Sequence, residues 1–272
     1  MTILQAIILG VIQGIAEFLP ISSSGHLIFL PQLFGWQDQG IAFDAIVHLG
    51  TLGAVVVYFR KKIMAIIQSC MKRGVDDKLN QRLAILIILS IIPAGIVGLF
   101  GKSLIEENLR SVSVIAFGLI FWGIVMFFGD RLNQKWKKEG KELVDINHLS
   151  GKQMLFVACA QAIALIPGTS RSGITMTAGL FAGLDKKAVA EFSFLMSIPI
   201  IALAGGLKVL ELIQSGMGDL TVTVLFVGFI ASALSGFVAI AGLMKIVQKW
   251  NFTPFVIYRI VLGIALISWI VM

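Results

Sequence analysis

The segment Gln13–His26 reads QGIAEFLPISSSGH and interrupts an apolar run with a carboxylate, three serines and a histidine. A second segment, QAIALIPGTSRSGIT at 161–175, has the same layout. In both, a glutamine stands nine positions before the first serine of an S-x-S-G element, and a proline lies between them. Because polar groups are costly inside a lipid-bound segment, we interpret both stretches as functional.

The composition around these segments is that of an α-helical membrane protein. Hydrophobic residues make up 57% of the 272 residues, 14% are charged and the mean hydropathy is +0.93, outside the range of soluble domains. Most of the apolar stretches could cross the ~30 Å hydrocarbon core as helices. They are continuously apolar rather than alternating, which disfavours a β-barrel. The eight stretches are 3–30, 41–59, 83–101, 112–129, 153–182, 190–207, 222–244 and 254–272.

Three further features limit the class of protein. The N-terminal MTILQAIILG lacks the basic region and cleavage site of a secretory signal, so we expect it to remain in the mature protein. Cys70 and Cys159 stand in unrelated contexts and indicate no disulfide framework. A net charge of +7 would suggest nucleic acid in a soluble chain. Here the positive residues fall in inter-helix loops, so they indicate orientation and we expect no nucleic-acid partner.

The charges of the loops predict the topology. Loop 60–82 carries seven basic and two acidic residues, so we expect it in the cytoplasm. If all eight stretches crossed, the basic loops near 186 and 245 would lie outside, against the positive-inside rule. If stretch 153–182 instead turns back, every basic loop faces the cytoplasm. That stretch contains the helix-breaking residues Pro167, Gly168 and Gly173.

We therefore predict an all-α polytopic membrane protein with six transmembrane helices and two re-entrant helical hairpins. Pro20 and Gly25 would lie at the first hairpin tip. Residues 1–272 would form a single domain of two repeats, approximately 1–129 and 151–272, joined by a cytoplasmic loop at 130–150. Three crossings per half is an odd number, so the repeats have inverted topology and their broken helices should meet near the midplane. Both termini would lie outside.

Arg171, in PGTSRSG, indicates an anion site. A guanidinium binds phosphate through two parallel hydrogen bonds, and the backbone N–H groups of a reopening helix add to the attraction. Ser170, Ser172 and Thr175 offer further donors. The alternative is that Arg171 only forms an ion pair with a buried carboxylate such as Glu17.

Glu17 is the only acidic residue in its stretch, and Gln13 lies one helical turn before it on the same face. Glu17 could be a general base, a metal ligand or a structural acid. Carboxylate and amide oxygens suit Mg²⁺ or Ca²⁺, and Mg²⁺ needs only one or two protein ligands when substrate phosphates supply others. We therefore predict a divalent cation at Glu17, with Gln13 as a second candidate ligand.

Ser22, Ser23 and Ser24 precede Gly25 and His26. A serine becomes a nucleophile when a neighbouring base takes its proton, and either Glu17 or His26 could do so. The alternative is that these small residues only permit close helix packing. The residues alone favour Ser23 as the nucleophile without choosing firmly among three adjacent hydroxyls. His26 could instead be a hydrogen-bonded histidine at the hairpin turn.

Four further polar residues in or near apolar stretches are secondary candidates. Asp44 and His48 form an i, i+4 pair that could line the cavity or satisfy each other. Glu191 stands at the start of its stretch. Arg259 lies a few residues into the last stretch, and we expect it to extend to the cytoplasmic interface.

The runs EFLPISSSGH (17–26), PGTSRSG (167–173) and EFSFL (191–195), together with NFTPFVIYR (251–259), resemble the undecaprenyl-diphosphatase family, also known for bacitracin resistance. The resemblance covers essentially the whole chain. It implies a bacterial inner-membrane hydrolase that converts undecaprenyl diphosphate to undecaprenyl phosphate and phosphate, recycling the lipid carrier for cell-wall synthesis, with a site that opens to the outer side.

The resemblance also implies roles for particular residues. The catalytic set falls on Glu17, Ser23, His26 and Arg171. The family pattern allows Glu or Gln at the position of Gln13, which cannot ionise, so a metal scheme with two carboxylates is in doubt here. The candidate substrate-binding residues are Gln13, Ser22, Ser24, Gly168, Thr169, Ser170, Ser172, Gly173 and Thr175.

Two other functions stay open beside a phosphatase. Inverted repeats with broken helices are also the design of secondary transporters and would suit a lipid flippase. Serine and histidine at membrane depth could indicate an intramembrane protease, although Arg171 in an anion-binding loop has no use in peptide hydrolysis. A homodimer is left open, since small-residue spacings are common in membrane helices.

Overall fold

The computed structural model describes residues 1–71, 77–109, 111–215 and 220–271, so residues 72–76 of the basic loop 60–82 lie outside the described residues. The regular secondary structure of the described residues is helical, apart from one isolated bridge between Val144 and Leu184. The helices are α1 (Ile3–Phe18), α2 (Ser23–Leu33), α3 (Gly40–Tyr58), α4 (Arg60–Met71), α5 (Lys78–Leu89), α6 (Ile91–Asn108), α7 (Val112–Lys138), η1 (Ile146–His148), α8 (Gly151–Ile163), α9 (Arg171–Phe181), α10 (Lys186–Ser215), α11 (Val222–Lys249) and α12 (Thr253–Val271).

Six described segments are long and apolar enough to cross a membrane, as the sequence predicts. They are α3, α5 continued into α6, α7, α10, α11 and α12. The chain is therefore a polytopic helical membrane protein.

Polar side chains determine where several helices begin. Thr2 with Gln5, and Ser150 with Gln153, form capping boxes at the starts of α1 and α8.

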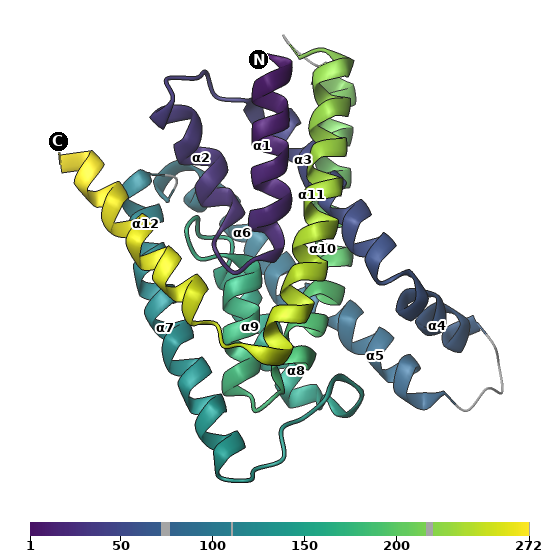
Figure 1. Cartoon of the computed structure of the whole chain (residues 1–272). Helices are drawn as coiled ribbons and strands as arrows, with labels where there is room; N and C mark the ends of the chain where they lie inside the picture. Colours follow the sequence, from purple (N-terminus) through teal and green to yellow (C-terminus); the bar gives the residue numbers. More distant parts are fainter. Residues whose placement is uncertain (72–76, 110, 216–219, 272) are drawn as a thin grey trace.

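The two remaining apolar stretches fold as helix pairs. Stretch 3–30 forms α1 and α2, and stretch 153–182 forms α8 and α9. In Figure 1, α1 descends from the upper end and α2 returns towards it, whereas α8 and α9 occupy the lower half. The chain termini lie at the upper end. The turns of the two pairs lie in the interior of the molecule.

Small residues let α1 lie almost in backbone contact with α11. A Cβ atom added at Gly10 would stand 2.7 Å from the carbonyl oxygen of Gly228, and one added at Gly14 would stand 2.5 Å from that of Ser232. Gly10 and Gly14 form a G-x-x-x-G spacing, which permits such an approach between membrane helices. This packing holds α1 rigidly, and with it Glu17 near its end.

Phe18 fixes the end of α1 against α10. Its ring meets that of Phe194 edge to face, with centroids 5.3 Å apart and both residues fully buried.

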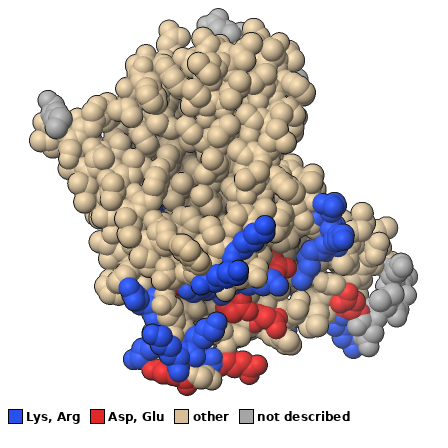
Figure 2. Space-filling model, viewed as in Figure 1, with Lys and Arg blue, Asp and Glu red and all other residues tan. Residues whose placement is uncertain are grey.

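Charged side chains gather at the lower end of the molecule. Figure 2 shows Lys and Arg over the lower half of the visible face, where α10 begins and α11 ends. The hydrophobic interior thus surrounds the two turns, and the basic segments share one end.

Candidate active site

The two turns end in matching helix starts. Ser22 and Ser170 are the only non-glycine residues with positive φ in the described chain, at 76° and 73°. Each caps the following helix by accepting a hydrogen bond from the N–H of Gly25 or Gly173. L-residues rarely adopt this conformation, and such strain concentrates at functional sites. The repeated S-x-S-G element therefore encodes one repeated backbone geometry, with Ser23 and Arg171 as the first residues of their helices.

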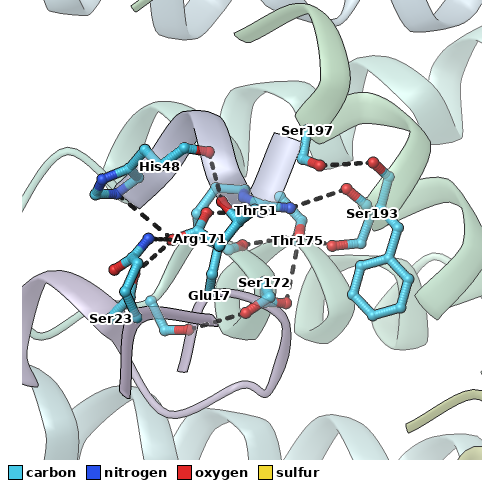
Figure 3. Close-up of polar contacts among 12 residues, drawn as sticks. Glu17, Ser23, His48, Thr51, Arg171, Ser172, Thr175, Ser193 and Ser197 are labelled. Atoms are coloured by element: carbon cyan, nitrogen blue, oxygen red, sulfur yellow. Dashed lines mark hydrogen bonds and ion pairs between the residues drawn. The ribbon is translucent and has the colours of Figure 1, made fainter. Parts of the chain in front are cut away.

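Glu17 is the centre of the polar cluster in Figure 3. Its Oε2 accepts hydrogen bonds from the Ser23 hydroxyl at 2.6 Å and from Nε2 of Gln13 at 3.0 Å. Its Oε1 accepts one from Nη2 of Arg171 at 2.9 Å. The Glu17 side chain is only 6% exposed and that of Arg171 13% exposed. Residues 154 positions apart thus meet at one buried carboxylate.

Arg171 is held from a second side by α10. Its Nη1 donates to the carbonyl oxygen of Ser193 at 3.0 Å. The Thr175 hydroxyl, one turn further along α9, bonds the Arg171 carbonyl at 2.8 Å and lies 2.8 Å from the Ser193 hydroxyl. The guanidinium is consequently oriented towards Glu17 before any ligand arrives.

His48 also reaches this cluster. Its Nε2 lies 3.6 Å from Oε2 of Glu17, and its Nδ1 lies 2.6 Å from the backbone oxygen of Asp44. The sequence placed His48 and Asp44 among the secondary candidates. Their i, i+4 spacing in an apolar helix was the available signal, but the approach of His48 to Glu17 depends on how α3 packs on α1. The sequence pattern gives no separate signal for Ser193, which lies inside the EFSFL run.

His26 has other partners in the structure. Its Nδ1 lies 2.7 Å from the carbonyl oxygen of Ser22, and its Nε2 lies 2.6 Å from the hydroxyl of Tyr258, on whose ring it stacks. These two contacts engage both ring nitrogens. No described contact joins His26 to Glu17, Ser23 or Arg171, so its predicted catalytic role stays a prediction.

The other predicted substrate-binding residues mostly contribute to the conformation and packing of the two turns. The Ser172 hydroxyl donates to the carbonyl of Leu19 at 3.0 Å and so joins the two turns. Gly168 has φ +87° and lies so close to α7 that an added Cβ would be 2.5 Å from the carbonyl oxygen of Ile115. The Thr169 hydroxyl is buried without a partner among the described residues. Ser24 is half-buried and has no described hydrogen bond to Glu17.

Arg259 does not reach the cytoplasmic interface; that expectation is wrong. The side chain is fully buried, and its three nitrogens donate to five backbone carbonyls at 2.9–3.2 Å. Three of these carbonyls belong to the non-helical turns, where Arg259 takes the place of water as the donor, and this explains why a cation lies inside the molecule. The five carbonyls belong to Pro20 in the first turn, Gly118 and Leu119 on α7, and Gly168 and Thr169 in the second turn.

A cavity of about 290 Å³ leads from this cluster between α3 and α10. Glu17, Arg171 and His48 line one part of it, and Asp44 and Lys208 supply its other charged groups. The remaining lining is apolar: Ile41, Ala45, Ile200, Ile201, Ala204 and Gly205. Asp44 lies in the second turn of α3 and Lys208 in the last third of α10, and Figure 1 shows the start of α3 and the end of α10 towards its upper end. A polar head with an apolar tail would suit this cavity.

The residues present could hold a divalent cation only together with ligand oxygens. No group of three or more His, Cys, Asp or Glu residues in the described chain has metal-binding geometry. Glu17 is the one carboxylate in contact with Arg171 among the described residues, and Oε1 of Gln13 is buried there without a partner. One carboxylate and one free amide oxygen match the small protein share of a Mg²⁺ site that substrate phosphates complete.

A polytopic helical bundle that buries an arginine, a carboxylate and a serine hydroxyl in mutual contact defines an integral membrane protein with a polar cluster in its interior. A family model described as bacitracin resistance protein BacA matches residues 6–265, and the chain belongs to that family. Three similar proteins carry matching names. Undecaprenyl-diphosphatase 2 of Stutzerimonas stutzeri (strain A1501) is 46% identical, with 98% of each chain covered. Undecaprenyl-diphosphatase 1 of Pseudoalteromonas translucida (strain TAC 125) is also 46% identical over 98% of each. The undecaprenyl-diphosphatase of Hahella chejuensis (strain KCTC 2396) is 47% identical over 99%.

Proposed function

We propose that this protein is an undecaprenyl-diphosphatase, which hydrolyses undecaprenyl diphosphate to undecaprenyl phosphate and phosphate. It would thereby recycle the lipid carrier for cell-wall synthesis and confer bacitracin resistance. The observation that carries the proposal is the buried Glu17, which contacts Arg171 from one turn and Ser23 from the other. Nearly full-length relatives with this name support the same activity.

The two helix pairs act in this proposal as re-entrant hairpins of an inverted repeat. α1 and α2 are 16 and 11 residues long, about 24 and 16 Å at 1.5 Å per residue, less than the ~30 Å of a bilayer core. α8 and α9, with 13 and 11 residues, are similarly short. The segments that precede them lie at opposite ends in Figure 1. The basic end would face the cytoplasm of a bacterial inner membrane, and the cavity beside Lys208 would open outside.

Substrate binding begins at Arg171. The terminal phosphate of the diphosphate competes with Glu17 for the guanidinium, whose planar fork suits phosphate oxygens. The contact with Ser193 holds Arg171 in place during this exchange. The polyprenyl tail would leave through the apolar part of the cavity between α3 and α10. Preorganised positive charge is the main contribution that a protein makes to phosphoryl transfer.

The chemical step follows from the Ser23–Glu17 contact. Glu17 takes the hydroxyl proton as Ser23 Oγ attacks the terminal phosphorus, and the bridging P–O bond breaks to release undecaprenyl phosphate. Water then hydrolyses the phosphoserine, which returns the hydroxyl and releases phosphate. In the alternative, Glu17 activates a water that attacks directly and Ser23 only binds phosphate. His48, 3.6 Å from Glu17, is positioned to stabilise the Glu17 carboxylate when the substrate phosphate displaces it from Arg171.

A divalent cation, Mg²⁺ or Ca²⁺, would be held by Glu17 and by Oε1 of Gln13, with the diphosphate supplying further oxygens. When bound, it would neutralise charge on the diphosphate. Treatment with EDTA is expected to stop phosphate release, and added Mg²⁺ or Ca²⁺ to restore it. Full activity of the EDTA-treated protein, after dialysis against metal-free buffer, would remove the cation from the proposal.

A lipid transporter is the second candidate, favoured by two helix pairs that meet inside the molecule. Purified protein in detergent separates the two functions because no compartments exist there. We expect phosphate release from undecaprenyl diphosphate by the wild-type protein and its loss in Glu17→Gln, which keeps the side-chain shape but cannot accept a proton as a carboxylate does. A folded wild-type protein that releases no phosphate with either cation present would favour transport.

A further inference from the structure

A second cavity, of about 530 Å³, lies at the opposite end of the molecule and shares no lining residue with the active-site cavity. It is bounded by the last turns of α7, the start of α10, the end of α11 and the segment before α12. Its volume lies within the range of ordinary small-molecule sites. The proposed phosphatase reaction uses none of the residues that form it.

The lining of this cavity is strongly basic. Four lysines face one acidic residue, Asp185. The carboxylate of Asp185 already accepts a hydrogen bond from the N–H of Ala188 at 2.8 Å, so it caps the start of α10. The cavity therefore combines an excess of positive charge with an acid whose role is structural. The lysines are Lys137, Lys186, Lys187 and Lys249.

Three of these lysines are available to a ligand. Lys186 forms an ion pair with the buried Asp130 at 2.8 Å, which anchors the wall of the cavity. Within the described chain, no hydrogen bond or ion pair engages the ammonium groups of Lys137, Lys187 or Lys249, and all three residues are exposed. Three like charges on three different elements repel one another unless an anion lies between them.

The position of the cavity indicates which kind of anion it would suit. It opens where three membrane-crossing helices, α7, α10 and α11, reach the basic end of the molecule. Trp250, which lines it, is 66% exposed, and tryptophan concentrates at the level of lipid head groups. Basic pockets between membrane helices at this level bind anionic head groups.

We propose that this cavity binds the phosphate of an anionic phospholipid, such as phosphatidylglycerol, from the adjacent leaflet. Lys137, Lys187 and Lys249 would surround the phosphate, and Trp250 would lie beside the glycerol region. The bound lipid would bridge the ends of α7, α10 and α11, so it would stabilise the folded protein by mass action. A free phosphate compound offers the same charge, so the experiment must separate the two sources.

The test compares two triple variants of the full-length protein. Lys137→Gln/Lys187→Gln/Lys249→Gln removes the three free lysines of the cavity. Lys61→Gln/Lys138→Gln/Lys152→Gln removes the same charge from exposed lysines that do not line it. Each protein is delipidated, and binding of phosphatidylglycerol and of phosphatidylcholine is measured by native mass spectrometry and by the rise in unfolding temperature.

We expect the wild type and the control variant to prefer phosphatidylglycerol, and the cavity variant to bind it at least about tenfold more weakly. Phosphate release by the cavity variant should stay at the wild-type level, because none of the three substituted lysines lines the active-site cavity. Equal loss in the control variant would reduce the effect to overall charge and overturn the site. Undiminished preference in the cavity variant would overturn it too.

A soluble arm distinguishes the source of the phosphate. Millimolar inorganic phosphate or glycerol phosphate should not displace phosphatidylglycerol. Because phosphate also suits the proposed active site, any rise in unfolding temperature that it causes should be the same in the wild type and in the cavity variant. If either compound displaces the lipid, or stabilises the wild type more than the cavity variant, the lipid assignment is wrong. Should the triple variant fail to fold, the single Lys249→Gln variant replaces it. This change lies at an exposed position at the end of α11 and should weaken phosphatidylglycerol binding by a smaller factor.

Discussion

At the level of single residues, Arg171 donates in two directions, to the Glu17 carboxylate and to the Ser193 carbonyl. A lysine could reach one of these acceptors but not both in the same plane, because its ammonium is a point charge on a flexible stem. The orientation of this cation, as well as its charge, is therefore part of the site.

Arg171→Lys is accordingly expected to lower phosphate release about 10²–10³-fold, the cost of losing one well-placed charged donor. The measurement is the release rate of purified protein at saturating substrate. Arg131→Lys, in which the altered cation lies over the Phe127 ring outside the site, is the matched control. An Arg171→Lys variant that works near the wild-type rate would refute bidentate binding.

Ser23 and Ser24 provide a comparison between neighbours. Only Ser23 contacts Glu17, at 2.6 Å. Ser23→Ala should reduce the rate by at least about 10²-fold because the nucleophile is lost, whereas Ser24→Ala should stay within a few-fold of wild type. Trapping of a phosphorylated protein on Ser23 would support the covalent route. Comparable rates in both variants would assign the attack to water.

At the level of elements, the two turns depend on Arg259 and on Gly168. Arg259 donates to carbonyls of both turns and of α7, so this one side chain connects all three segments. Gly168 lies where α7 leaves no space for a side chain. Both residues therefore hold the two turns in place without belonging to the cluster around Glu17.

Arg259→Met should destabilise the protein by about 3–5 kcal/mol, because it leaves several buried carbonyls without donors. Thermal unfolding in detergent measures the loss.

Gly168→Ala should also unfold at a lower temperature, because its Cβ would meet the Ile115 oxygen at 2.5 Å and φ is +87°. Gly206→Ala on α10, with open space around its Cβ, is the control and should be neutral or slightly stabilising. A Gly168→Ala variant as stable as wild type would contradict the close approach of the turn to α7.

At the level of the whole molecule, the ends differ in charge. The chain termini, the start of α3 and the end of α10 lie towards one end, and the basic segments lie at the other. The active-site cavity is lined by this first part of α3 and last part of α10. The proposed orientation places the end with the termini outside. Loop accessibility can test this independently of activity.

In a background of Cys70→Ser and Cys159→Ser, we expect Asp38→Cys to react with a membrane-impermeant maleimide in intact spheroplasts. Gly140→Cys should react only after the cells are broken. Both positions are exposed, so burial does not explain a difference between them. Labelling of Gly140→Cys alone in intact cells would reverse the proposed orientation.

Local sequence was enough to predict the membrane class, six of the apolar helices and the two S-x-S-G turns, because hydropathy and helix breakers act over short distances along the chain. It also indicated Glu17, Ser23 and Arg171, since charged and hydroxyl groups are conspicuous in apolar stretches. Only the packing of the helices decides which of these groups are in contact. Glu17 meets Arg171 and His48 because α1 packs between elements that lie far along the chain. Arg259 is fully buried for the same reason: its five acceptors come from three separate segments, and local sequence carries no information about such distant partners.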